Sequence, residues 1–156
     1  MTSEKLESVY RSMIPAAKSF VENGKQVVPV IFAVKPDGDL ALIQLPGFRT
    51  DAEKHTLYRA AGEYLRETLH ATGAVLINES WMVSEKRGVD LKIRPSAHPN
   101  RRECIIAVLC DYNGATLYVL PFERGESGAI KWEAEERHTG SGVECNLFTA
   151  FRDGVQ

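Results

Sequence analysis

Apolar residues recur at steps of three and four near the start of the chain and predict an amphipathic helix over residues 3–22. Pro15 falls inside this pattern and has no backbone N–H to donate, so we expect a kink there or a break into two shorter helices. Gly24 is expected to end the helix. The apolar stripe consists of Leu6, Val9, Tyr10, Met13, Ala17, Phe20 and Val21.

Two apolar runs separated by a turn sequence predict a β-hairpin. The first run covers residues 27–34 and is rich in β-branched side chains, and the second covers residues 40–45. Between them, Lys35-Pro36-Asp37-Gly38-Asp39 supplies a proline with a fixed φ and a glycine that tolerates a tight turn. Pro29 cannot donate to a strand ladder, which favours an edge position or a bulge.

A capping sequence opens the clearest helix of the chain. The Thr50 hydroxyl is expected to accept a hydrogen bond from the third helical residue, while the Glu53 carboxylate reaches back. Gly73 is expected to end this helix. Its apolar stripe consists of Leu57, Ala60, Ala61, Tyr64, Leu65 and Leu69.

After Gly73 the apolar period changes to two, which predicts strands. Both alternating sets of residues 75–83 are largely apolar, which indicates a central strand. Two further strands are expected over residues 102–111 and 116–122, joined by a turn that contains Asn-Gly, a strong hairpin signal. These strands belong to one mostly antiparallel sheet.

The last part of the chain is less regular. Residues 129–135 alternate in a way that is typical of an amphipathic edge strand. Residues 138–142 are expected to form a flexible linker, and residues 143–151 an apolar tail that is either helical or extended.

The order of these elements predicts an α+β fold in a single domain, residues 1–156. We expect a mostly antiparallel sheet of five to six strands with two main helices on one face, in the order α-β-β-α-β-β-β-β-tail. This order resembles small α+β scaffolds of the roadblock and profilin-like kind, in which a sheet often mediates pairing. The resemblance implies an architecture and no reaction.

Composition narrows the class of protein. The 156 residues are 44% hydrophobic, which suits one ordinary core. The longest apolar run has eight residues, well short of the roughly 20 that a membrane helix needs, and the amino terminus shows no export signal. The three cysteines have no C-x-x-C spacing, which fits a reducing compartment. We therefore expect a cytoplasmic protein with no membrane contact. The sequence indicates no cofactor and no zinc knuckle, and whether a metal is bound stays open.

Charge is distributed unevenly although the net charge is only −2. Residues 85–103 hold six basic and three acidic residues, whereas residues 123–156 are acidic. The basic segment includes a long connection between two predicted strands. Connections this long are uncommon in compact domains and are often functional. Its prolines, Pro95 and Pro99, restrict the backbone around Ser96 and His98.

Three interpretations of this connection stay open. In the first, backbone amides bind an anion together with the side chains of Ser96, His98, Arg101, Arg102 and Arg94, because a guanidinium donates two parallel bonds to phosphate or carboxylate. In the second, His98 and Glu103 act as general acid and base, or as metal ligands together with Glu79 or Asp111. In the third, the connection is a structural crossover whose arginines are solvated or paired with nearby acids.

The segment Ser96-Ala97-His98-Pro99-Asn100-Arg101-Arg102-Glu103 has the pattern Ser-x-His-Pro-x-Arg-x-Glu. With this pattern, the chain resembles small bacterial or phage proteins of uncharacterised function. The resemblance implies a location for a site and no activity.

Two functions follow from these observations. The first is a protein–protein interaction or self-associating module, whose partner is itself or another protein, because sheet edges, the amphipathic last strand and the apolar tail offer contact surfaces. The alternative is a hydrolase or binding protein for a small anionic ligand that carries phosphate or carboxylate, with residues 94–103 as its site. Nucleic acid is disfavoured because the pI is about 6.1 and no aromatic residue interleaves the basic segment. Whether the chain is an enzyme is left open.

Overall fold

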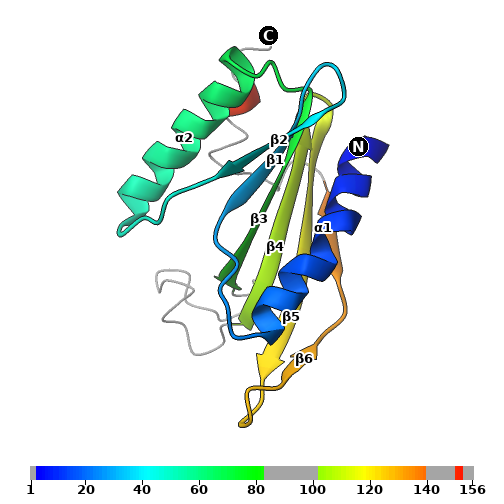
Figure 1. The fold of residues 1–156 in the computed structure, drawn as a ribbon, viewed down its shortest axis with the longest axis vertical. Coiled ribbons are helices and arrows are strands. Elements are labelled where there is room, and N and C mark those ends of the chain that lie inside the picture. The colour runs from blue at the N-terminus through cyan, green and yellow to red at the C-terminus, as the bar shows by residue number, and fades with distance from the viewer. Residues whose placement is uncertain (1–2, 83–101, 140–149, 153–156) are drawn as a thin grey trace.

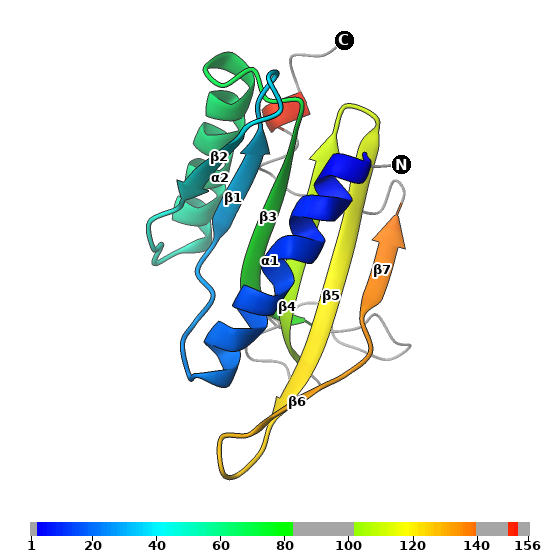
Figure 2. The same cartoon turned by 45° about the vertical axis from the view of Figure 1, so that its right-hand side comes forward.

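One antiparallel sheet with a long helix against each face forms the protein (Figure 1, Figure 2). The computed structural model describes residues 3–82, 102–139 and 150–152. The sheet order is β2-β1-β3-β4-β5-β6, and β7 also pairs with β5. Along the chain the elements are α1 (Glu4–Glu22), β1 (Val30–Val34), β2 (Leu40–Gln44), α2 (Asp51–Glu67), β3 (Gly73–Met82), β4 (Arg102–Asp111), β5 (Gly114–Arg124), β6 (Ile130–Trp132) and β7 (Glu136–Thr139).

The two helices lie on opposite faces of the sheet, and the expectation that both cover one face is wrong. On β3, Val75 and Ile77 belong to the core beneath α1, whereas Ala74 and Leu76 belong to the core beneath α2. The physical reason is the alternation of β3, in which both sets of side chains are apolar. Such a strand has to be covered on both faces.

Helix α1 begins at the Ser3 cap, whose hydroxyl accepts a hydrogen bond from the Leu6 N–H at 3.4 Å. It continues through Pro15 to Glu22, so the expected break into two helices does not occur. Pro15 is exposed, while Ile14 and Ala17 beside it are buried against the sheet. Packing on both sides of the proline therefore holds the helix together despite the missing hydrogen bond.

Helix α2 begins as predicted, with the Glu53 N–H donating to the Thr50 hydroxyl at 3.1 Å. The Glu53 carboxylate reaches one residue further back than expected and accepts from the Arg49 N–H at 2.7 Å. The helix ends at Glu67, before the predicted end at Gly73. Its buried stripe is rotated from the predicted one and consists of Tyr58, Ala61, Gly62 and Leu65.

The end of the described chain differs most from expectation. His138 and Thr139, predicted as linker, belong to β7, which pairs with β5 through Thr116↔Thr139 and Leu117↔His138. Phe151 is fully buried in the core beneath α2 and stacks on Tyr112 with ring centroids 4.9 Å apart. The described end of the apolar tail is therefore part of the core. No described helix is long and apolar enough to cross a membrane.

Candidate functional site

Strand β2 forms one edge of the sheet (Figure 2). Among the residues that the structure describes, it pairs with β1 alone, in a register that sets Leu42 opposite Phe32. This pairing confirms the predicted hairpin, whose turn lies between Val34 and Leu40. Within the described residues, no strand pairs with the other side of β2.

The backbone groups that face this free side follow from the hydrogen bonds of the hairpin. The Lys35 N–H donates to the Asp39 carbonyl at 2.8 Å, and the Leu45 N–H donates to the Pro29 carbonyl at 3.1 Å. Hydrogen-bonded pairs alternate along an antiparallel ladder, so the odd positions of β2 bond to β1 and the even positions point their N–H and C=O groups outward. The outward positions of β2 are Leu40, Leu42 and Gln44.

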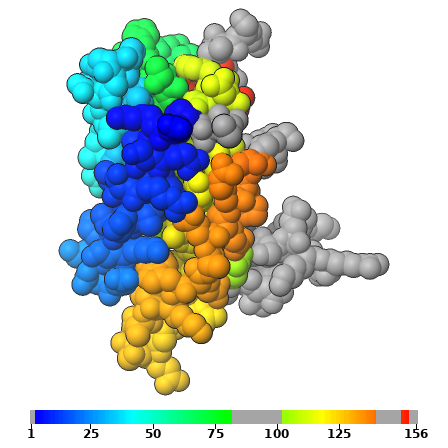
Figure 3. Space-filling view, turned by 90° about the vertical axis from the view of Figure 1, so that its right-hand side faces the viewer, coloured from blue at the N-terminus to red at the C-terminus, as the bar shows by residue number. Residues whose placement is uncertain are grey.

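The side chains of the edge are apolar and exposed. Leu42 is 65% exposed and Leu40 is 42% exposed. Both lie on the face that α1 covers elsewhere, but α1 packs against the central strands β3 and β4 and stops short of β2. In Figure 3 the cyan segment around β2 forms the left-hand rim, beyond the blue helix.

Protein edge strands normally carry a device that prevents pairing with another chain, such as a charge, a proline or a bulge. Strand β2 has the sequence Leu-Ala-Leu-Ile-Gln, without charge, proline or glycine, and its register with β1 is unbroken. An edge of this kind is suited to pairing with a strand of another molecule.

An open hollow of about 480 Å³ lies where β2 leads into α2. Pro46 and Gly47 line it from the chain after β2, and Ala52, Glu53, Thr56 and Leu57 line it from α2. The hollow therefore borders the edge formed by β2, next to the end of the strand that follows the exposed leucines.

Most of the predicted site within residues 94–103 lies outside the described residues, namely Arg94, Ser96, His98 and Arg101. Their roles stay predictions. Arg102 and Glu103, the members that the structure describes, begin β4. As neighbours in a strand, their side chains leave opposite faces of the sheet.

Both of these residues are engaged with opposite charges. The Arg102 guanidinium lies 3.0 Å from the Glu136 carboxylate and 3.9 Å from Glu133. The Glu103 carboxylate accepts from the Arg124 Nε at 2.7 Å. Next to them is a hollow of about 360 Å³ lined by Trp81, Arg102, Glu103, Phe122, Glu123, Arg124 and Glu133. Its three acidic side chains outnumber its two basic ones, which gives no preference for an anion.

Of the further ligands considered for a metal, Glu79 comes close to Glu103 but Asp111 does not. The Arg124 guanidinium lies 3.8 Å from the Glu79 carboxylate and 2.7 Å from the Glu103 carboxylate. Asp111 stands at the other end of β4, about 26 Å away by strand rise, where it accepts from the backbone N–H groups of Ser3, Asn113 and Gly114. Glu79 accepts from the Val27 N–H at 3.1 Å. In the described part of the chain, no group of three or more His, Cys, Asp or Glu residues is arranged to hold a metal ion.

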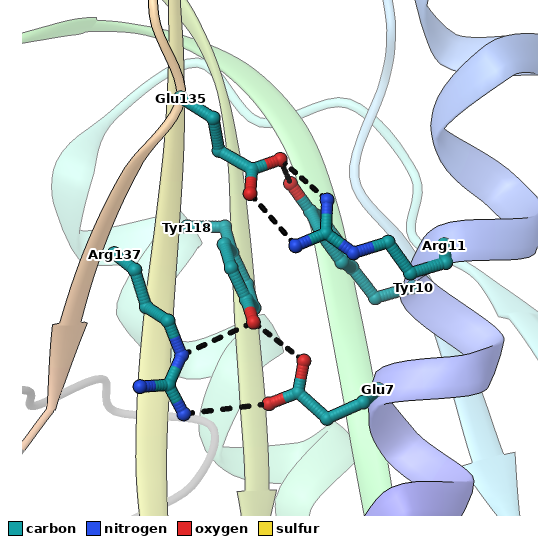
Figure 4. A network of polar contacts seen from close by, with 6 residues as sticks. All are labelled: Glu7, Tyr10, Arg11, Tyr118, Glu135 and Arg137. Atoms are coloured by element: carbon teal, nitrogen blue, oxygen red, sulfur yellow. Dashed lines mark hydrogen bonds and ion pairs between the residues drawn. The ribbon is translucent and has the colours of Figure 1, made fainter.

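A polar network that the sequence did not reveal ties α1 to the segment between β6 and β7 (Figure 4). The Glu135 carboxylate accepts two bonds from Arg11, each 2.8 Å, and one from the Tyr10 hydroxyl at 2.8 Å. Burial by itself raises the pKa of Glu135, but the bonds from Arg11 and Tyr10 outweigh it, so the pKa lies below its ordinary value. Burial and the bond to Glu135 raise the pKa of Tyr10.

A second set of contacts continues this network onto β5. The Tyr118 ring stacks on Tyr10 with centroids 4.1 Å apart, and its hydroxyl donates to Glu7 at 2.5 Å. Arg137 of β7 donates to the same hydroxyl at 3.1 Å and lies 3.7 Å from Glu7. Every group drawn in Figure 4 has an opposite charge or a hydrogen-bond partner, so the network is a structural clamp.

Comparison with protein-family models, with curated proteins and with solved structures finds no match for this chain. The functional argument therefore rests on the free β2 edge and the exposed leucines beside it.

Proposed function

We propose that the protein is a protein-binding module and that it takes up a partner strand along β2. One observation carries the proposal: the outward backbone groups of Leu40, Leu42 and Gln44 stand on an edge that has no charge, proline or bulge. Main-chain hydrogen bonds to an added strand give affinity, and side chains on alternate positions give specificity.

The exposed side chains support the same choice. Leu40 and Leu42 lie on one face of β2, so an added strand places its own side chains beside them at the spacing of a cross-strand pair. Contacts of this kind bury apolar surface that β2 now exposes to water.

The surface proposed here differs from part of the sequence-based expectation. Phe151 is buried, so the end of the tail cannot serve as a contact surface. The cytoplasmic location that goes with the proposal is supported by Cys104 and Cys110, which are free thiols.

The alternative of a hydrolase or binding protein for an anionic ligand gains no support from the described residues. Arg102 and Glu103 each have a partner of opposite charge, and the other predicted members of that site lie outside the described residues.

Retention of partners on immobilised protein tests the proposed function. We expect wild-type protein to retain a partner from an extract of the cells that produce it, and Leu42→Lys to lose that partner. Tyr64→Lys is the control, because it introduces the same charge at an exposed large side chain of α2, 45% exposed against 65% for Leu42. Equal retention by wild type and Leu42→Lys would contradict the proposal.

A further inference from the structure

The outward groups of β2 are arranged symmetrically about Leu42, and this arrangement suits a partner strand of the same sequence. Resting on the proposed function, we propose that this strand is β2 of a second copy of the chain, paired antiparallel about a two-fold axis through Leu42.

The positions of the outward groups carry this inference. The outward residues Leu40 and Gln44 stand at equal distances on either side of Leu42. A two-fold axis through Leu42 therefore sets Leu42 against Leu42 of the second copy and Leu40 against its Gln44. In that register every outward N–H meets an outward C=O of the other copy, and no free group of β2 is left unpaired. An interface of this kind is isologous and closes at two copies.

Charge supports a second copy as the occupant. A two-fold axis places the centre of a strand against itself, and any charged residue there would meet a like charge. The five residues of β2 carry no charge. The nearest exposed charges are Asp37 and Asp39 on one side of β2 and Arg49 and Asp51 on the other. Antiparallel pairing brings the two aspartates before β2 toward Arg49 and Asp51 of the other copy, so the absence of charge in β2 itself is what favours a second copy.

The hollow beside β2 fits the same arrangement. With Leu42 on the axis, Asp39 of the second copy comes opposite Leu45. The turn that precedes Asp39, which contains Pro36, then comes beside Pro46 and Gly47, which line the hollow of about 480 Å³. The ends of the pairing therefore meet an open surface that leaves room for the turn.

Engineered disulfides test the register directly. In Leu42→Cys the two Cα atoms would be about 5.5 Å apart across the axis, within the range that a disulfide bridges. In Leu40→Cys, the matched control, the two cysteines would be about 13 Å apart along the strands. We expect mild oxidation to cross-link Leu42→Cys into a covalent dimer well beyond wild type, and Leu40→Cys to stay at the wild-type level. Equal cross-linking of the two variants, or none above wild type, would overturn the proposed register.

The mass in solution tests the partner without engineered thiols. We expect light scattering to give twice the 17.4 kDa chain mass for wild type and for Leu42→Val, and the single chain mass for Leu42→Lys. Circular dichroism of Leu42→Lys checks that it is folded. A wild type that stays at the single chain mass at its highest attainable concentration would refute the second copy.

The two proposals fail in different ways. If wild type is a monomer but Leu42→Lys still loses a different protein from the extract, the edge binds a foreign strand and only the second copy is refuted. If Leu42→Lys changes neither the mass nor the retained proteins, both proposals are refuted.

Discussion

Removing the Glu135 carboxylate tests whether the clamp of Figure 4 holds α1 on the sheet. The change is Glu135→Ala, which deletes the acceptor of the Tyr10 hydroxyl and the partner of Arg11. Tyr10 is fully buried, whereas the Arg11 side chain is 56% exposed. The two losses therefore differ in size.

The magnitude follows from this difference in burial. A buried hydroxyl without a partner costs about 1–3 kcal/mol, and an ion pair with an exposed arginine contributes about 0.2–1 kcal/mol. We expect Glu135→Ala to lower the free energy of unfolding by about 1–4 kcal/mol in total, most of it from Tyr10. Urea unfolding with linear extrapolation measures this change.

A double-mutant cycle assigns the loss to Tyr10. In a Tyr10→Phe background no hydroxyl is left without an acceptor, so Glu135→Ala should cost only the smaller, Arg11 part, about 0.2–1 kcal/mol. Arg11→Ala serves as the control, because it removes the exposed partner and leaves the buried bond in place. An equal cost of Glu135→Ala in both backgrounds would refute the argument that the buried hydroxyl dominates.

Three further predictions concern the rest of the described chain. Phe151→Ala should cost about 3–5 kcal/mol in urea unfolding, because the ring is fully buried, and a cost near zero would contradict its place in the core. The pKa of Glu135 lies below its ordinary value, so the stabilisation from its carboxylate is lost as the pH falls through the lowered pKa. The difference in unfolding free energy between wild type and Glu135→Gln should therefore shrink on acidification. A constant difference would contradict the lowered pKa. Burial raises the pKa of Cys104 to about 12, so alkylation at mildly basic pH should modify it only on unfolding, and rapid labelling of folded protein would contradict this.

The sequence predicted most elements because their signals are local. Thr50 and Glu53 mark the start of α2, and the Asn113-Gly114 turn marks the β4–β5 hairpin, since capping and turn chemistry act over a few residues. The observed α+β class and antiparallel sheet confirm these predictions. Of the kink or break expected at Pro15, the break does not occur, because the packing of Ile14 and Ala17 against the sheet outweighs the local cost of the proline.

Properties that depend on distant contacts were predicted less well. The alternation of β3 showed that both sets of side chains are apolar, but not which helix covers which face. Strand β7 escaped prediction because His138 and Thr139 carry no apolar pattern, and only pairing with β5 makes them a strand.

The sequence predicted that a sheet edge mediates contact, but it did not predict which edge. Sheet edges were expected to mediate contact, but the sequence favoured the last strand and the tail. Which edge is free depends on strand order, and the local pattern of residues 40–44 does not reveal that order. The same limit applies to the contact between Tyr10 and Glu135, which are 125 residues apart.

Amide hydrogen exchange at each position of β2 tests the central claim most directly. Ala41 and Ile43 bond to β1, so their amides should be protected at every protein concentration. The outward amides of Leu40, Leu42 and Gln44 should be protected in concentrated protein and should exchange faster on dilution, as the second copy leaves. Rapid exchange of the outward amides at all concentrations, with no effect of added partner, would contradict the claim that this edge takes up a strand.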